Sequence, residues 1–125
     1  MTWEEWRFSA RLAWQDPFIR WTSIATTFFC IGMSAFMLWR LIPEGARAGV
    51  LTLHYNIYLG IDEVGPWEWI FIFPGMMFAV LVLNTMFSCG CFRVHSLAAR
   101  TIMLTTAMLA VLWGVGSFFL ILVNL

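Results

Sequence analysis

Long apolar runs alternate with short polar stretches along this chain of 125 residues. Three of the runs, at positions 21–38, 70–88 and 101–123, contain no Asp, Glu, Lys, Arg or His. An α-helix rises about 1.5 Å per residue, so about 20 apolar residues match a hydrocarbon core roughly 30 Å thick. The pattern therefore predicts an all-α membrane protein with three transmembrane helices.

Proline and polar residues set the expected limits of these helices. Asp16 followed by Pro17 is typical of a helix start, and Pro43 disfavours helix in the residue before it. We expect transmembrane helices over residues 17–42, 67–90 and 96–123, with an outer loop over residues 43–66. Because no long polar segment is left over, residues 1–125 are expected to form a single membrane domain.

Residues 1–15 are too polar for the bilayer core but are rich in aromatic side chains. Trp3, Trp6 and Ala10 recur at helical spacing, whereas Glu4 and Arg7 fall on another face. This spacing predicts an N-terminal amphipathic helix that lies in the membrane interface. Such a helix would either anchor the chain to the bilayer or dock onto a partner subunit.

The arginines predict the orientation of the chain. Five lie beside the ends of the spans on the side of the N-terminus, and two lie on the opposite side. Positive residues favour the cytoplasmic side, so we expect a cytoplasmic N-terminus and a C-terminus outside. Tryptophans near both ends of the spans are expected to anchor them at the two interfaces. These are Trp3, Trp6, Trp14, Trp39, Trp67 and Trp69.

Small and weakly polar residues within the spans predict how the helices pack, since membrane helices associate through such residues. The first span carries Thr26, Cys30 and Ser34 at intervals of four residues, and the third carries Thr106, Ala110 and Gly114 at the same interval. In the second span, Asn84 is expected to bond to another helix, because an unpaired buried amide is costly. The same residues could pack either within one chain or against other subunits.

Composition narrows the classes of function. Hydrophobic residues make up 62% of the chain and charged residues 11%, the net charge is zero, and there is no lysine. Binding to nucleic acid through a basic patch is therefore not expected. The lack of ionisable residues within the spans argues against a pump or an ion-coupled transporter. Cys89, Cys91 and His95 lack a fourth ligand on their side, so we expect no metal site. The two histidines lie on opposite sides of the membrane and outside the spans, and no Ser-His-Asp motif is present, so we expect no cofactor and no enzymatic activity.

The outer loop contains the one segment with its own chemistry. Apolar and polar residues alternate from position 51 to position 59, which predicts a half-buried strand. Such a strand must lie on the bundle, pair within the loop or pair with a neighbouring chain. His54, Tyr55, Asn56 and Asp62 could converge on a ligand there. Alternatively, Asn56 and Asp62 cap turns and His54 bonds to a carbonyl of the loop.

His54, Tyr55, Asn56, Gly60, Asp62 and Trp67 resemble the extracytoplasmic signature of the bacterial DUF1648 membrane family. In that signature a His-aromatic-Asn is followed by Gly, Asp and Trp just outside a transmembrane helix. The loop also resembles that of small uncharacterised three-helix bacterial membrane proteins. The resemblance covers about 15 residues and implies a multi-pass protein of the bacterial cytoplasmic (inner) membrane, with a structured outer loop and no catalysis. Some members of the family belong to immunity and signalling proteins for a secreted toxin.

Two functions fit these features. The first is a non-catalytic structural or accessory subunit of a larger integral membrane protein complex, whose partners are the lipid bilayer and other membrane subunits or copies of itself. The second is a stand-alone membrane receptor or immunity-like protein that binds a peptide or small ligand with its outer loop. Enlarging Gly114 or Ala110 should weaken association in the first case, and His54→Ala should abolish ligand binding in the second.

Overall fold

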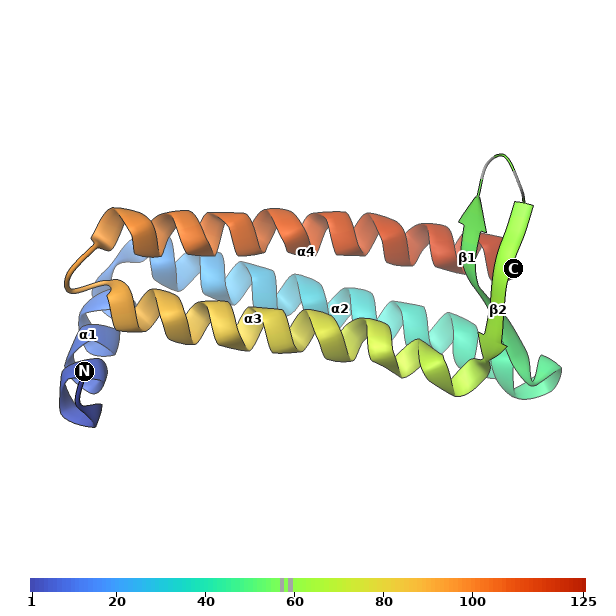
Figure 1. Ribbon diagram of the computed structural model, residues 1–125, viewed down its shortest axis with the longest axis horizontal. Coiled ribbons are helices and arrows are strands. Elements are labelled where there is room, and N and C mark those ends of the chain that lie inside the picture. The colour runs from blue at the N-terminus through green and yellow to red at the C-terminus, as the bar shows by residue number, and fades with distance from the viewer. Residues whose placement is uncertain (57, 59) are drawn as a thin grey trace.

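The computed structural model folds into a long bundle of three helices with a short helix across one end and a β-hairpin at the other (Figure 1). It describes residues 1–56, 58 and 60–125, and of residues 55, 56 and 60–62 the backbone alone. In chain order the elements are α1 (Trp3–Gln15), α2 (Pro17–Ala48), β1 (Val50–Asn56), β2 (Gly60–Pro66), the 3-10 helix η1 (Trp67–Phe71), α3 (Ile72–Cys91) and α4 (Ser96–Asn124).

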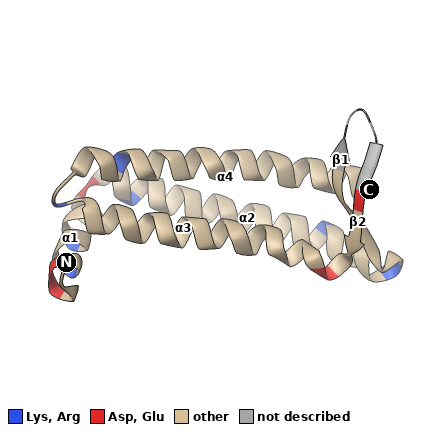
Figure 2. Ribbon diagram, viewed as in Figure 1, with Lys and Arg blue, Asp and Glu red and all other residues tan. Residues whose placement is uncertain are grey.

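Three helical segments are long and apolar enough to cross a membrane: Pro17–Ala48, Trp67–Cys91 and Ser96–Asn124. The sequence-based prediction of three such helices is confirmed. Charged residues gather at the two ends of the bundle and leave its middle free of charge over a long stretch of the described chain (Figure 2). This distribution is the one expected of a multi-pass membrane protein.

The buried residues of α2 and α4 follow the same spacing. They recur at intervals of four, three and four residues, which is an 11-residue repeat. This repeat corresponds to about 3.67 residues per turn, so nearly straight helices can stay in contact over their whole length. The repeat comprises Ile19, Ser23, Thr26, Cys30, Ser34, Met37 and Leu41 on α2, and Ala99, Met103, Thr106, Ala110, Gly114, Ser117 and Ile121 on α4.

Helix α1 begins and ends at strong capping residues. The Thr2 side chain accepts a hydrogen bond from the Glu5 N–H, and the Glu5 carboxylate accepts one from the Thr2 N–H, which together form a capping box. Asp16 ends α1 and also caps the start of α2, where its carboxylate accepts a hydrogen bond from the Ile19 N–H at 3.0 Å. Consequently α1 crosses the end of the bundle (Figure 1).

The expected end of the first transmembrane helix at Pro43 is wrong. Helix α2 continues through Pro43 to Ala48, so the connection to β1 is shorter than the predicted outer loop. Gly45 is buried against Trp67, and the Gly49 N–H caps the end of the helix by donating to the Gly45 carbonyl at 2.7 Å. The contact with Trp67 and this cap offset the backbone hydrogen bond that proline cannot make.

The predicted strand of the outer segment has a partner within the segment. Strands β1 and β2 pair antiparallel, with Val50 opposite Pro66 and Asn56 opposite Gly60. Of the three arrangements left open by the sequence, pairing within the loop is observed, and β1 also packs against the end of the bundle through Leu51. The second span then begins with η1 and becomes α-helical only at Ile72, so the expected helix start at residue 67 is a 3-10 turn.

Candidate functional site

The hairpin is fixed to the bundle at its base. Gly49 has a φ of 76°, a left-handed conformation that glycine adopts at low cost, and it turns the chain from α2 into β1. Leu51 is buried with Met37, Leu41 and Ile121 from the bundle. These contacts make Leu51, the second residue of β1, part of the core and set the direction in which the hairpin leaves it.

The C-terminal end of α4 supplies a second attachment. The Asn124 side-chain oxygen accepts a hydrogen bond from the Thr52 N–H at 2.7 Å, and its amide nitrogen donates to the Thr52 carbonyl at 2.8 Å. The same amide group donates to the Leu120 carbonyl at 2.9 Å. One side chain therefore satisfies both backbone groups of a strand residue and holds β1 beside the last turns of α4.

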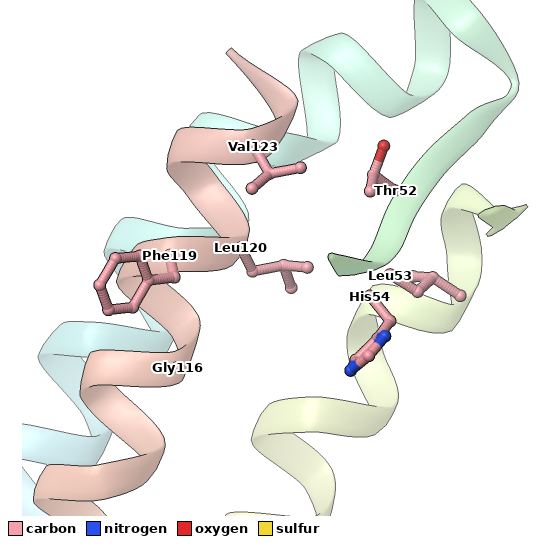
Figure 3. A pocket seen from close by; sticks show the side chains of 7 residues that line it. All are labelled: Thr52, Leu53, His54, Gly116, Phe119, Leu120 and Val123. Carbon is pink, nitrogen blue, oxygen red and sulfur yellow. The ribbon is translucent and has the colours of Figure 1, made fainter. Parts of the chain in front are cut away.

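A cavity of about 510 Å³ lies between β1 and α4. Ligand sites commonly measure about 300–1,000 Å³. The described residues that line it are Thr52, Leu53, His54, Gly116, Phe119, Leu120 and Val123. Figure 3 shows the side chains of Leu120 and His54 extending toward the space between the strand and the helix. We take this cavity as the candidate functional site.

The walls of the cavity differ in chemistry. The face contributed by α4 consists of glycine and apolar side chains, whereas β1 contributes a hydroxyl at Thr52 and an imidazole at His54. Among the described lining residues, His54 is the ionisable one, and it is exposed. The site can therefore hold an apolar body against α4 and hydrogen-bond a polar group at β1.

Of the four residues predicted to bind a ligand, His54 is the one whose side chain is described. His54 lines the cavity and lies opposite Glu63 in the hairpin register. The backbone of Tyr55 pairs with Ile61 farther along the hairpin. The side chains of Tyr55, Asn56 and Asp62 lie outside the described part of the structure, so the expected convergence of all four stays a prediction.

The residues predicted to pack helices lie between the helices of this chain. Thr26, Cys30 and Ser34 are buried on α2, and Thr106, Ala110 and Gly114 are buried on α4. The Asn84 amide, on α3, donates to the Thr106 hydroxyl at 2.9 Å. A methyl group at Gly114 would lie 2.6 Å from the ring of Phe29, on α2. The small residues therefore serve contacts within one chain, and their enlargement would disturb the fold itself.

The tryptophans predicted to anchor the chain lie toward the two ends of the bundle. Trp3, Trp14, Trp39 and Trp69 are exposed, whereas Trp6 and Trp67 are half-buried. The ring of Trp6 stacks on that of Trp3 at 5.3 Å, and its N–H donates to the Met86 carbonyl at 3.3 Å. Trp6 thus also joins α1 to α3.

The sequence analysis did not predict two residues that make contacts at the ends of the bundle. One is Asn124, which in the sequence belongs to a short tail after the third span. The other is Ser9, a buried residue of α1 whose hydroxyl donates to the Cys89 carbonyl at 2.7 Å and accepts from the Arg93 N–H at 3.1 Å. Ser9 lies four residues before Ala13, and this pair of small residues on one face was the available signal for close packing.

An ion pair joins α4 to the junction of α1 and α2. The Arg100 guanidinium lies 2.5 Å from the Asp16 carboxylate, of which 9% is exposed. The hydrogen bond from Arg100, together with that from the Ile19 N–H, lowers the pKa of Asp16 below its usual value of 3.8. The carboxylate is therefore charged over the whole neutral range, and it fixes the start of the first spanning helix against the third.

Comparison of the chain with protein-family models, with curated proteins and with solved structures gives no match.

Proposed function

We propose that this protein is a non-catalytic structural or accessory subunit of a larger integral membrane protein complex. The supporting observation is a strip of small residues on an outward face of α2, formed by Ala25, Gly32 and Ala35, all of which are exposed. A methyl group built at Gly32 would meet nothing beyond its own turns of helix within 4 Å. This small-residue strip therefore takes no part in the packing of its own bundle.

Glycine within a helix costs about 1 kcal/mol relative to alanine. At Gly114 a glycine has a packing reason, because the ring of Phe29 occupies the space beside it. Gly32, in the middle of α2, lacks such a neighbour, as do Gly75 and Gly116 on the other two spanning helices. Because small residues let helix backbones approach closely in a membrane, the small-residue strip at Gly32 favours docking of a helix from another subunit.

The charge distribution supports a defined orientation for this subunit. Arg7, Arg11, Arg20, Arg93 and Arg100 lie at the α1 end of the bundle, and Arg40 and Arg47 lie at the hairpin end. The rule that positive residues stay inside then favours a cytoplasmic N-terminus and a C-terminus outside, in a bacterial cytoplasmic membrane. Helix α1, with exposed Trp3 and Trp14, lies in the inner interface in this arrangement.

Native mass spectrometry of the protein, extracted gently from its own membranes, tests the proposal. We expect co-purification with larger membrane subunits at a fixed stoichiometry. Gly32→Leu should remove these partners, because the leucine side chain keeps a partner helix from approaching the small-residue strip. Ala98→Leu also introduces a leucine, at an exposed position on α4 away from the strip, and it should leave the partners bound.

Two results would contradict the assembly proposal. One is a free monomer or a small homo-oligomer under conditions that preserve other membrane complexes. The other is retention of all partners by a folded Gly32→Leu protein.

A stand-alone receptor is the second candidate, and the cavity at His54 favours it. In that case a peptide or small ligand binds at the outer hairpin, His54→Ala removes binding, and Gly32→Leu has no effect. A soluble ligand recovered from outside the cell with wild-type protein, and lost with His54→Ala, would establish this function.

A further inference from the structure

The hairpin lies across the end of the bundle and projects sideways past α4 (Figure 1). Strand β1 reaches this position because Asn124 binds the backbone of Thr52 and because Leu51 is buried in the core. The cavity described above lies below the strand, against an outward face of α4. It is therefore a recess that adjoins the apolar surface of the bundle and is covered by the hairpin.

A glycine creates room on the helix side of the recess. A methyl group at Gly116 would meet nothing within 4 Å, although the next residues along that face are Phe119 and Leu120. Gly116 is exposed, whereas Gly114, two residues earlier, is buried against α2. The hollow at Gly116 is thus not used for packing within the bundle.

The recess changes from apolar to polar along its length. Gly116 and Phe119 lie farther into the apolar span of α4, and Val123 lies beside its end. Thr52 and His54 line the recess from the hairpin, at the end of the bundle where charged residues reappear. A ligand that fits must have an apolar chain parallel to α4 and a polar group near the imidazole.

We propose that the recess binds one phospholipid molecule of the membrane, with an acyl chain along Gly116, Phe119 and Leu120 and the phosphate at His54. An imidazole N–H can donate to a phosphate oxygen, and such a charge-assisted hydrogen bond is about twice as strong as a neutral one. A phospholipid suits the site because the apolar wall is continuous with helix surfaces that face lipid. A water-soluble ligand would leave this wall without a matching surface.

This inference goes beyond the assembly proposal and does not depend on it. It shares His54 with the receptor proposal, whereas Gly116 and Phe119 belong to the recess below the hairpin. The small-residue strip at Gly32 lies on α2, so a variant there separates loss of a protein partner from loss of the lipid.

Native mass spectrometry with a defined phospholipid tests the site. The purified protein is stripped of lipid in detergent and titrated with dioleoyl phosphatidylglycerol or with dioleoylglycerol, which has the same chains but no phosphate. We expect saturable binding of one phospholipid per chain and about tenfold weaker binding of dioleoylglycerol. His54→Ala should abolish this difference between the two lipids.

Gly116→Leu fills the recess and should weaken phospholipid binding by about tenfold or more. Gly75→Leu is the matched control, because it replaces a glycine of α3 that is likewise exposed and without neighbours within 4 Å, and it should leave phospholipid binding unchanged. If Gly116→Leu does not give folded protein, Val123→Phe reduces the same space from the other end of the recess.

The proposal would be overturned if the phospholipid bound equally well to wild type and to a folded Gly116→Leu or Val123→Phe protein. Equal binding of the two lipids, unaffected by His54→Ala, would overturn the assignment of a phospholipid. Loss of protein partners on Gly32→Leu with retention of the phospholipid would support both proposals at separate sites.

Discussion

Asn124, the last residue of α4, pairs with the backbone of Thr52 as a neighbouring strand would. Its side chain both accepts from the Thr52 N–H and donates to the Thr52 carbonyl, at 2.7 and 2.8 Å. The edge of β1 is thereby closed at the point where it meets the helix. An exposed strand edge is otherwise a template for pairing with other chains.

Replacing Asn124 by leucine should release β1 from α4. Each lost hydrogen bond contributes about 1 kcal/mol, so amide exchange at Thr52 should become faster by roughly tenfold or more. Asn124→Asp retains the acceptor and loses the donor, so it should have an intermediate effect. Hydrogen exchange measured by mass spectrometry on the peptide that contains Val50–Asn56 checks this. Unchanged exchange in both variants would show that the pairing contributes nothing.

Gly45→Ala should destabilise the protein. The added methyl group would lie 2.6 Å from the Cβ of Trp67, an atom that cannot move without the backbone, and overpacking of this kind costs about 1–3 kcal/mol. Gly32→Ala is the control and should be neutral or slightly stabilising, since glycine is the poorer helix former. Thermal unfolding in detergent, followed by circular dichroism, compares the two. Equal unfolding temperatures would contradict the close approach of α2 to η1.

Pro43→Ala should stabilise the protein. Because α2 continues through this position, alanine restores the N–H that can donate to the carbonyl of Trp39, and proline within a helix costs about 3 kcal/mol. The expected gain is at most of that size. Urea unfolding in mixed micelles measures it, with Pro66→Ala, at the end of β2, as a comparison outside the helix. A loss of stability in Pro43→Ala would indicate that the proline shapes the end of the helix.

Acid should weaken the attachment of α4 at Asp16. The folded-state pKa of Asp16 lies below 3.8, so its contribution to stability is present above that pH and is lost as the pH falls through the folded-state pKa. The unfolding temperature of wild type should therefore drop below about pH 4. Asp16→Asn keeps a capping side chain but loses the ion pair with Arg100, and it should show less of this drop. If the unfolding temperatures of the two proteins fall identically with pH, Asp16 is not the cause of the loss of stability in acid.

The three spanning helices could be predicted from the sequence because the bilayer excludes charged residues from every one of them, whatever their packing in the bundle. The alternation over residues 51–59 likewise indicated β1, which is a local pattern of side chains. Strand β2 was not anticipated, since Gly60, Gly65 and Pro66 disfavour a strand and β1 alone provides its partner. The continuation of α2 beyond Pro43 and the role of Asn124 depend on contacts between distant segments. Such contacts have no local signature.

Asp16 is both the C-cap of α1 and the N-cap of α2, so no flexible linker separates the two helices. Inserting a single residue there would rotate α1 by about 100° about its own axis. With the junction intact, α1 is a rigid arm about 20 Å long. A tilt of the three-helix bundle would therefore raise or lower the Trp3 end of the arm, so this end of the molecule could report a change in bilayer thickness.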